Sequence, residues 1–345
     1  MQYPIAFSGR RMSRIHVTQC VLILGLVCAL FPGCSREEPV DTAVPQAADQ
    51  AQRTTEGEPT GDRVFTVYTT FYPMTYLTER IGGAHIRVVC PLPADEDAIF
   101  WQPPREVITK YQQADLIVTN GAEFEKWVGL ASLPLSRVVS TADGFRDRWV
   151  SFEATVHSHG ATGEHAHEGV DGHTWVDPIS AAVQSQAIAI ALKRALPDAS
   201  ADIDANLKAV GDDLMALDER LTGITPAIAE ALILCSHPAY NYVAARYDLD
   251  VHNLALDPET VPTEEEWAHV KSVIDEAGGS RTMTVMLWEA EPLESVSSRL
   301  AADLGVVSVV FDPCEQPSDA ESGDYMTRMN ANIDRLTAVL QGGGG

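Results

Sequence analysis

The strongest constraint on the fold is an alternation of short apolar runs with longer amphipathic segments, which occurs twice along the chain. The apolar runs predict strands and the amphipathic segments predict helices, an order typical of parallel sheets built from βαβ units. The sequence therefore predicts an α/β fold with two lobes, each containing a parallel sheet. The predicted strands are 64–70, 86–92, 115–121 and 136–142, then 231–237, 250–256, 284–290 and 307–313.

Two helical segments, 179–195 and 199–222, separate the two repeats. In the second of them apolar residues recur at helical spacing, and the other face is charged. We expect this segment to be a long, rigid helix that joins an N-terminal lobe, 63–198, to a C-terminal lobe, 223–340. The length of 345 residues suits two domains of ordinary size.

The first 34 residues have the order of a secretory signal, with basic residues, then an apolar run at 20–31, then a small residue before Cys34. This order is similar to a bacterial lipobox, so we expect export and lipid attachment at Cys34. Residues 35–62 contain almost no large apolar side chains, which predicts a flexible tether.

The formal net charge of −25 argues against nucleic acid and anionic membranes as partners. It favours a cation as ligand, although solubility alone would also explain it. We therefore expect contact with the membrane only through the lipid anchor.

Five of the ten histidines lie between residues 157 and 173, a density typical of metal binding. Four of them lie among small and polar residues without strand or helix periodicity, which predicts a mobile loop over 157–167. These four are His157, His159, His165 and His167. The fifth, His173, lies in the sequence GHTWVDP, which predicts an ordered turn leading into a helix.

Ligands of open parallel sheets bind beyond the carboxyl ends of the strands. His237 and Asp312 lie at the ends of predicted strands in the second lobe, and His173 closes the irregular segment of the first. Imidazole nitrogen and carboxylate oxygen together suit Zn, Mn or Fe. Singly, each residue is more often a packing or turn residue, so the prediction depends on their meeting in one crevice. Glu289 also ends a predicted strand and is either a group that supports the ligands or a surface acid.

Six stretches between residues 64 and 340 carry a family resemblance and occur in the family's order. They are VYTTFYPMTYLTERIGG, QQADLIVTNGAEFEKWV, GHTWVDP, SHPAYNYVAARYDL, VMLWEAEP and GDYMTRMNANIDRL. The chain resembles the metal-binding lipoproteins of bacterial zinc and manganese ABC importers, the cluster A-I solute-binding proteins. The resemblance implies two lobes bridged by one rigid helix, with a metal in the crevice between them. It also implies that His173, His237 and Asp312 are ligands and that the histidine loop is the one typical of zinc-handling members.

The chain departs from the family pattern at one ligand. The family has a histidine in the loop after the second strand, whereas Ala98 occupies that position here and three acids precede it. Either Glu96 or Asp97 replaces the missing imidazole, or the site has three protein ligands and a water.

We therefore expect an extracytoplasmic, monomeric binding protein that captures one divalent metal ion and delivers it to the permease of an ABC importer. Zinc is favoured over manganese or iron because of the histidine loop. A hydrolase is one alternative, because three ligands plus water is also the pattern of catalytic zinc, but neither an HExxH motif nor a nucleophile elbow is present. A metal store or adhesin is another, with the histidine loop as the main binder.

Three cysteines, Cys90, Cys235 and Cys314, lie beyond the predicted tether. Cys235 and Cys314 each lie within two residues of a predicted ligand in one lobe. They form either a disulfide or two buried reduced thiols.

Overall fold

The computed structural model describes residues 63–94, 96–158, 164–277, 279, 281–318 and 323–342. The predicted signal with Cys34, the tether and His159 lie outside the described residues, as do the side chains of His157, His165 and His167. Within the described part, no helix combines the length and the apolar character that crossing a bilayer requires.

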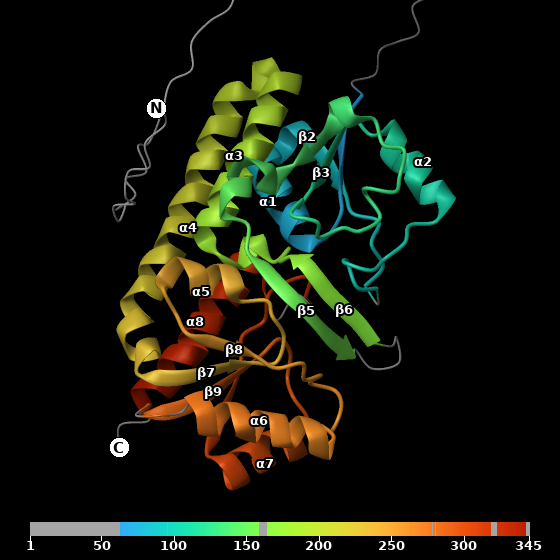
Figure 1. Cartoon of the computed structure of the whole chain (residues 1–345). Helices are drawn as coiled ribbons and strands as arrows, with labels where there is room; N and C mark the ends of the chain where they lie inside the picture. Colours follow the sequence, from blue (N-terminus) through green and yellow to red (C-terminus); the bar gives the residue numbers. More distant parts are fainter. Residues whose placement is uncertain are drawn as a thin grey trace, which may run out of the picture. The chain divides into compact units, whose positions relative to one another are not determined.

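The N-terminal lobe contains a parallel sheet with the strand order β2-β1-β3-β4 (Figure 1). Each of its strands matches one of the predicted strands. They are β1 (Phe65–Thr69), β2 (Ile86–Val89), β3 (Leu116–Thr119) and β4 (Val138–Ser140). The accompanying helices are α1 (Tyr72–Gly82), α2 (Arg105–Gln113) and α3 (Pro178–Ala195). Short 3₁₀ turns lie at Gly83–His85, Leu135–Arg137, Thr141–Arg148 and Thr174–Val176.

The C-terminal lobe repeats this arrangement with the strand order β10-β9-β7-β8, again parallel. Its strands are β7 (Ala231–Cys235), β8 (Val251–Asn253), β9 (Met283–Trp288) and β10 (Val306–Val310). Its helices are α5 (Asn241–Tyr247), α6 (Glu264–Ala277), α7 (Glu294–Leu304) and α8 (Tyr325–Gly342). The predicted two-lobed α/β fold with parallel sheets is thus confirmed.

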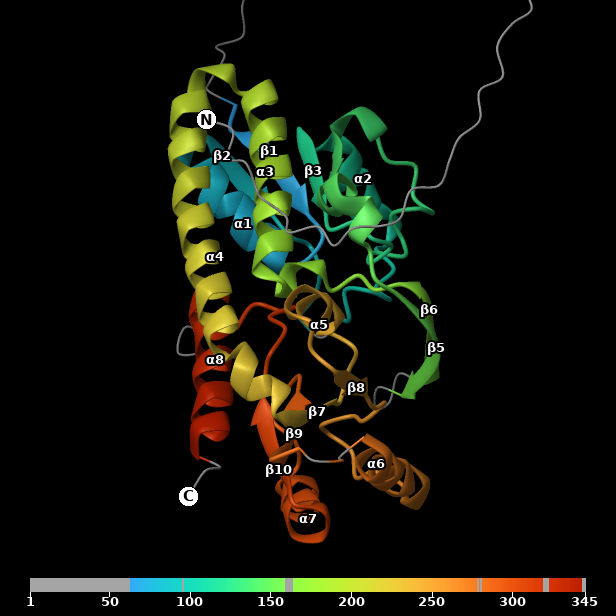
Figure 2. The ribbon, with the colours of Figure 1, turned by 60° about the vertical axis from the view of Figure 1, so that its left-hand side comes forward.

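The connecting helix α4 (Ser200–Ala229) follows a 3₁₀ turn at Pro197–Ala199 and is longer than the predicted 199–222. Its buried residues follow helical spacing, so one stripe faces the core; they are Ile203, Val210, Leu214, Leu217, Leu221 and Ile228. The helix passes α1 and α3 in its first half and α8 in its second (Figure 2). It continues through Pro226 in its last turn, where the proline removes one backbone hydrogen bond close to the end of the helix.

One apolar core runs through both lobes along the inner faces of the two sheets. It joins residues of β1, α1, α3, α4, β7 and α8, such as Val67, Leu77, Ile188, Leu214, Ile233 and Ile333. Smaller clusters cover the outer faces, one with Tyr111 of α2 and one with Trp267 of α6. Both lobes therefore share a continuous core beside α4.

The predicted loop at 157–167 is in part an antiparallel hairpin, so its expected lack of secondary structure is wrong for the described residues. Strands β5 (Ser151–Ser158) and β6 (Glu164–Val170) pair with His157 opposite His165. The prediction relied on apolar–polar alternation, which the second strand lacks, whereas a hairpin is held by backbone groups that every residue carries.

Candidate metal centre

His173 enters the site from the turn between β6 and α3. Asp171, which is fully buried, accepts hydrogen bonds from both the backbone N–H of His173, at 2.9 Å, and its ring Nδ1, at 2.7 Å. The turn then leads into α3, whose N-terminus is capped by Asp177 through the backbone N–H groups of Ile179 and Ser180. Because Nδ1 donates to Asp171, the lone pair of the neutral ring lies on Nε2, ready to bind a metal.

His237 enters from the opposite lobe, two residues after β7 ends at Cys235. The backbone N–H of Ser236 donates to Leu287, which keeps this segment beside β9. The Nε2 atoms of His173 and His237 lie 3.3 Å apart, and both histidines are buried. Two of the three residues that were predicted to meet in one crevice, His173 and His237, are therefore close together in the structure.

Glu315 completes the cluster, with its Oε1 atom 3.1 Å from Nε2 of His173. In the described part of the chain, His173, His237 and Glu315 form a group whose ligand atoms all lie within 4.8 Å of one another. Zinc–nitrogen distances of about 2.0–2.1 Å in a tetrahedral site put neighbouring ligand atoms about 3.3 Å apart. The two measured separations are close to this value, so the three side chains fit a tetrahedral ion with one further position.

Glu289 lies behind His237, and its Oε2 is 3.8 Å from Nδ1 of that ring. This separation is within ion-pair range but too long for a hydrogen bond. Burial, together with the nearby charge of Glu315, raises the pKa of Glu289 to about 8. The carboxyl group of Glu289 therefore lies in the C-terminal lobe beside the ring nitrogen of His237 that does not face His173.

The cluster attracts positive charge. Burial alone lowers the pKa of His173, but the carboxylates of Asp171 and Glu315 outweigh it and raise that pKa to about 10. Two Nε2 atoms facing each other at 3.3 Å also repel when both carry lone pairs. A proton relieves this repulsion in part, and a divalent cation does so more fully because it binds all three ligands.

The metal-free protein is expected to lose stability as pH rises. His173 and Glu289 both have raised pKa values, so the folded protein binds more protons than the unfolded chain. The stabilisation from Glu289 is lost between about pH 4.5 and 8, and that from His173 between about 6.5 and 10. Thermal unfolding at pH 6 and pH 9 should show a lower melting temperature at pH 9, with a smaller difference once a divalent cation is bound. An equal pH dependence with and without the cation would contradict this account.

Asp312 is not brought into the cluster, although the family resemblance implies that it is a ligand. Its carboxylate forms an ion pair with Arg328 of α8 and accepts a hydrogen bond from the backbone N–H of Cys314 at 2.7 Å. Binding a metal would require this carboxylate to give up its strong, charge-assisted hydrogen bonds to the guanidinium. Glu315, three residues further on, supplies the carboxylate instead.

Glu96 and Asp97 also lie outside the cluster, and both are exposed. Oδ1 of Asp97 accepts from the backbone N–H of Ile99 at 2.7 Å, so this acid caps the turn that follows. The backbone carbonyl of Glu96 accepts from Gln316, at 2.8 Å, and so joins this loop to the segment that carries Glu315. Ala98, at the position of the family histidine, is buried.

The three cysteines of the described chain are free, so a disulfide between Cys235 and Cys314 is not formed. Both of these thiols are buried, and burial raises the pKa of each thiol strongly. The alternative of two reduced thiols is therefore the one that the structure supports.

Two site residues, Asp171 and Glu315, escape prediction from the sequence. An acid two residues before a ligand histidine is a plausible partner for the second ring nitrogen, so Asp171 had a detectable signal. Glu315 had no such signal. Its place in the cluster depends on a turn of the chain after Asp312, where the backbone of Cys314 adopts a left-handed conformation (φ 63°).

Known proteins share both the sequence pattern and the fold. A family model described as zinc-uptake complex component A, periplasmic, matches residues 67–339. The zinc-binding lipoprotein AdcA of Streptococcus pneumoniae is 24% identical over 326 residues, which cover 91% of this chain and 60% of that protein. The chain thus spans about 60% of the length of this relative.

Solved structures of metal-binding proteins share the fold of this chain. The metal-dependent lipoprotein YcdH from Bacillus subtilis is 26% identical with a TM-score of 0.66, over 79% of this chain and 97% of that one. FpvC from Pseudomonas aeruginosa, solved with Mn²⁺, has a TM-score of 0.62 over 82% of this chain and 100% of that one. At 17% identity FpvC shows the shared fold alone.

Proposed function

Because the chain belongs to the family of periplasmic zinc-uptake component A, we propose that it captures one divalent metal ion outside the cytoplasm and delivers it to the permease of an ABC importer. The observation that carries the proposal is the cluster of His173, His237 and Glu315, in which each lobe contributes ligands. A site shared by two lobes can release its ion when a partner moves one lobe relative to the other. Members of this family are metal-binding solute-binding proteins rather than enzymes, so the hydrolase alternative has no support.

Zinc is the metal that we favour. Two imidazole nitrogens and one carboxylate oxygen form a ligand set that zinc accepts in a tetrahedral site, whereas manganese prefers more oxygen donors. We propose that a water takes the fourth position and that Glu96 and Asp97 remain outside it. The name of AdcA, a zinc-binding lipoprotein, supports this assignment.

We further propose that the protein is held at the membrane by a lipid on Cys34, as its sequence predicts and as the lipoprotein relatives suggest. Replacing Cys34 with serine should release the protein from the membrane fraction. Unchanged retention in that fraction would exclude this anchor.

Metal titration tests the proposed function. The protein is stripped with a chelator, and Zn²⁺ and Mn²⁺ are titrated separately and in competition. One tight zinc per molecule is expected, with weaker manganese binding. Several weak sites of similar affinity would favour the metal store or adhesin, and the absence of any tight site would exclude the proposal.

The histidine hairpin should not be needed for the tight site. Deleting residues 157–167 leaves the pairs Ser151–Val170 and Phe152–Gly169 at the base of the hairpin, so His173 keeps its turn. We expect one tight zinc per molecule to remain, with slower capture at low zinc concentration. Stopped-flow competition with a chromogenic chelator measures both quantities, and loss of the tight site would show that the hairpin supplies a ligand.

A further inference from the structure

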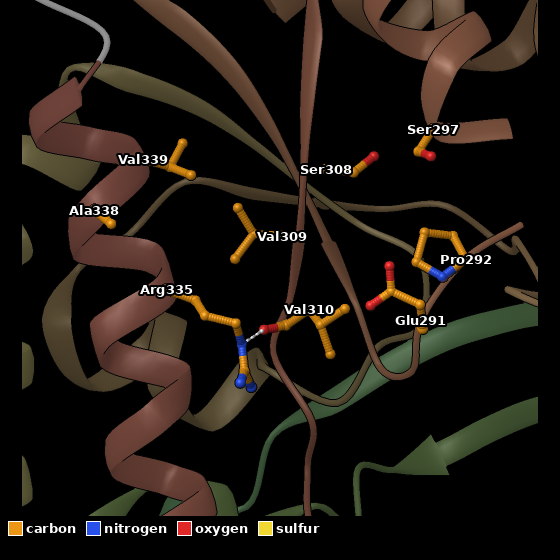
Figure 3. Close-up of a pocket in the computed structure, with 9 residues that line it drawn as sticks. All are labelled: Glu291, Pro292, Ser297, Ser308, Val309, Val310, Arg335, Ala338 and Val339. Atoms are coloured by element: carbon orange, nitrogen blue, oxygen red, sulfur yellow. Dashed lines mark hydrogen bonds between the residues drawn. The ribbon is translucent and has the colours of Figure 1, made fainter. Parts of the chain in front are cut away.

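Helix α8 holds the segment that carries Glu315 through three side chains at helical spacing: Arg328, Asn332 and Arg335. Arg335 donates through Nε to the carbonyl of Val310, at 2.8 Å, where β10 ends (Figure 3). Residues four and seven apart lie on one helix face, so this face of α8 fixes the chain from Val310 onward.

Asn332 fixes the backbone of Asp312 on both sides. Its Oδ1 accepts from the N–H of Asp312 at 3.0 Å, and its Nδ2 donates to the carbonyl at 2.7 Å. Asn332 is fully buried, so neither bond is shared with bulk water. The backbone position of Asp312 is therefore determined independently of its carboxylate.

Arg328 engages that carboxylate and also reaches past Glu315. Its Nε and Nη2 both donate to Oδ2 of Asp312, the former at 2.8 Å, and its Nη1 donates to the carbonyl of Gln316 at 2.7 Å. The guanidinium lies over the ring of Tyr72 and is largely buried. Glu315 lies between the two residues that Arg328 binds, and its own carboxylate is left to the metal cluster.

The carboxylate of Asp312, the acid nearest to the end of β10, is thus paired with Arg328, and an arginine keeps its charge at any physiological pH. We propose that Arg328 sets the metal preference by withholding Asp312 from the ion, so that the site binds through two nitrogens and the single carboxylate of Glu315. A second carboxylate would make the donor set harder and better suited to manganese. This inference rests on the proposed function, because it concerns the same ion.

The test compares the zinc and manganese affinities of Arg328→Met with those of the parent. Freed from its partner, Asp312 is expected to join the ion, and the preference for zinc over manganese should fall by about 10-fold or more, within the range typical of changes next to metal ligands. Co²⁺ gives a second readout, since its strong four-coordinate visible absorption should weaken when another oxygen binds. The double variant Arg328→Met, Asp312→Asn should regain the parental preference.

Two matched variants separate this role from support of the fold. Arg335→Met removes an arginine from the same helix face without touching the carboxylate of Asp312, so it should lower the melting temperature and leave the metal preference unchanged. Asp312→Asn alone should also keep the parental preference. The proposal is overturned if Asp312→Asn abolishes metal binding, or if Arg328→Met weakens zinc and manganese equally. Failure of the parent to bind any metal tightly would instead refute the proposed function.

Discussion

Replacing His173 with alanine is expected to weaken zinc binding more than 100-fold. His173 contributes one of the two nitrogens, and it is the member of the cluster that comes from the N-terminal lobe. Loss of a partner that merely orients a ligand costs about 10–100-fold in metal affinity, so loss of the ligand itself should exceed that range. The dissociation constant is measured by competition with a chelator of known affinity.

Two further variants bracket this result. Asp171→Asn keeps the ring of His173 but weakens the acceptor of its Nδ1 proton, so an intermediate loss of about 10–100-fold is expected. His85→Ala removes an exposed histidine of the same lobe that is paired with Asp202, and should leave zinc affinity unchanged. If His173→Ala binds zinc as tightly as the parent, the metal site lies elsewhere.

The two histidines could be predicted because their positions depend on local order. His237 follows a buried strand, and parallel strands of one sheet bring their carboxyl ends to one edge. His173 precedes a helix with a clear N-terminal signal in Asp177 and Pro178. In both cases the information lies within a few residues of the histidine, so the local sequence was enough to propose each of them as a site residue.

The carboxylate ligand could not be located in this way. Whether Asp312 or Glu315 faces the metal depends on Arg328, a residue on the following helix, and on the left-handed backbone of Cys314. Pairing between a loop and a later helix leaves no periodic trace in the sequence. The resemblance implied Asp312, whereas the structure places Glu315 in the cluster, because the choice between two neighbouring acids depends on the tertiary structure.

The second large effect is expected at Trp175, which joins the two lobes beside the metal site. The side chain is fully buried, and its indole N–H donates to the carbonyl of Pro313 at 2.7 Å. Its own carbonyl accepts from the hydroxyl of Tyr325 at 2.6 Å. Trp175 lies two residues after His173, and Pro313 lies two residues before Glu315. The hydrogen bond between Trp175 and Pro313 therefore fixes the positions of these two ligands, one from each lobe, relative to each other.

Trp175→Ala should lower the free energy of unfolding by about 3–5 kcal/mol, the usual effect of removing a buried aromatic side chain. Trp175→Phe keeps most of the packing and leaves the carbonyl of Pro313 without its donor, which costs about 1–3 kcal/mol. Both variants should also bind zinc more weakly, because the distance between His173 and Glu315 is no longer fixed. Urea unfolding of the metal-free protein and zinc competition measure the two effects.

Trp127→Phe is the matched control for the hydrogen bond. Trp127 is buried in the N-terminal lobe and packs against Tyr111, but its indole N–H has no partner among the residues that the structure describes. Its replacement therefore removes volume without breaking a hydrogen bond, so it should destabilise the protein less than Trp175→Phe and leave zinc affinity unchanged. If the two phenylalanine variants behave alike in both measurements, the bond to Pro313 contributes nothing beyond packing. The relative position of the two lobes would then be fixed by the shared apolar core along α4 alone.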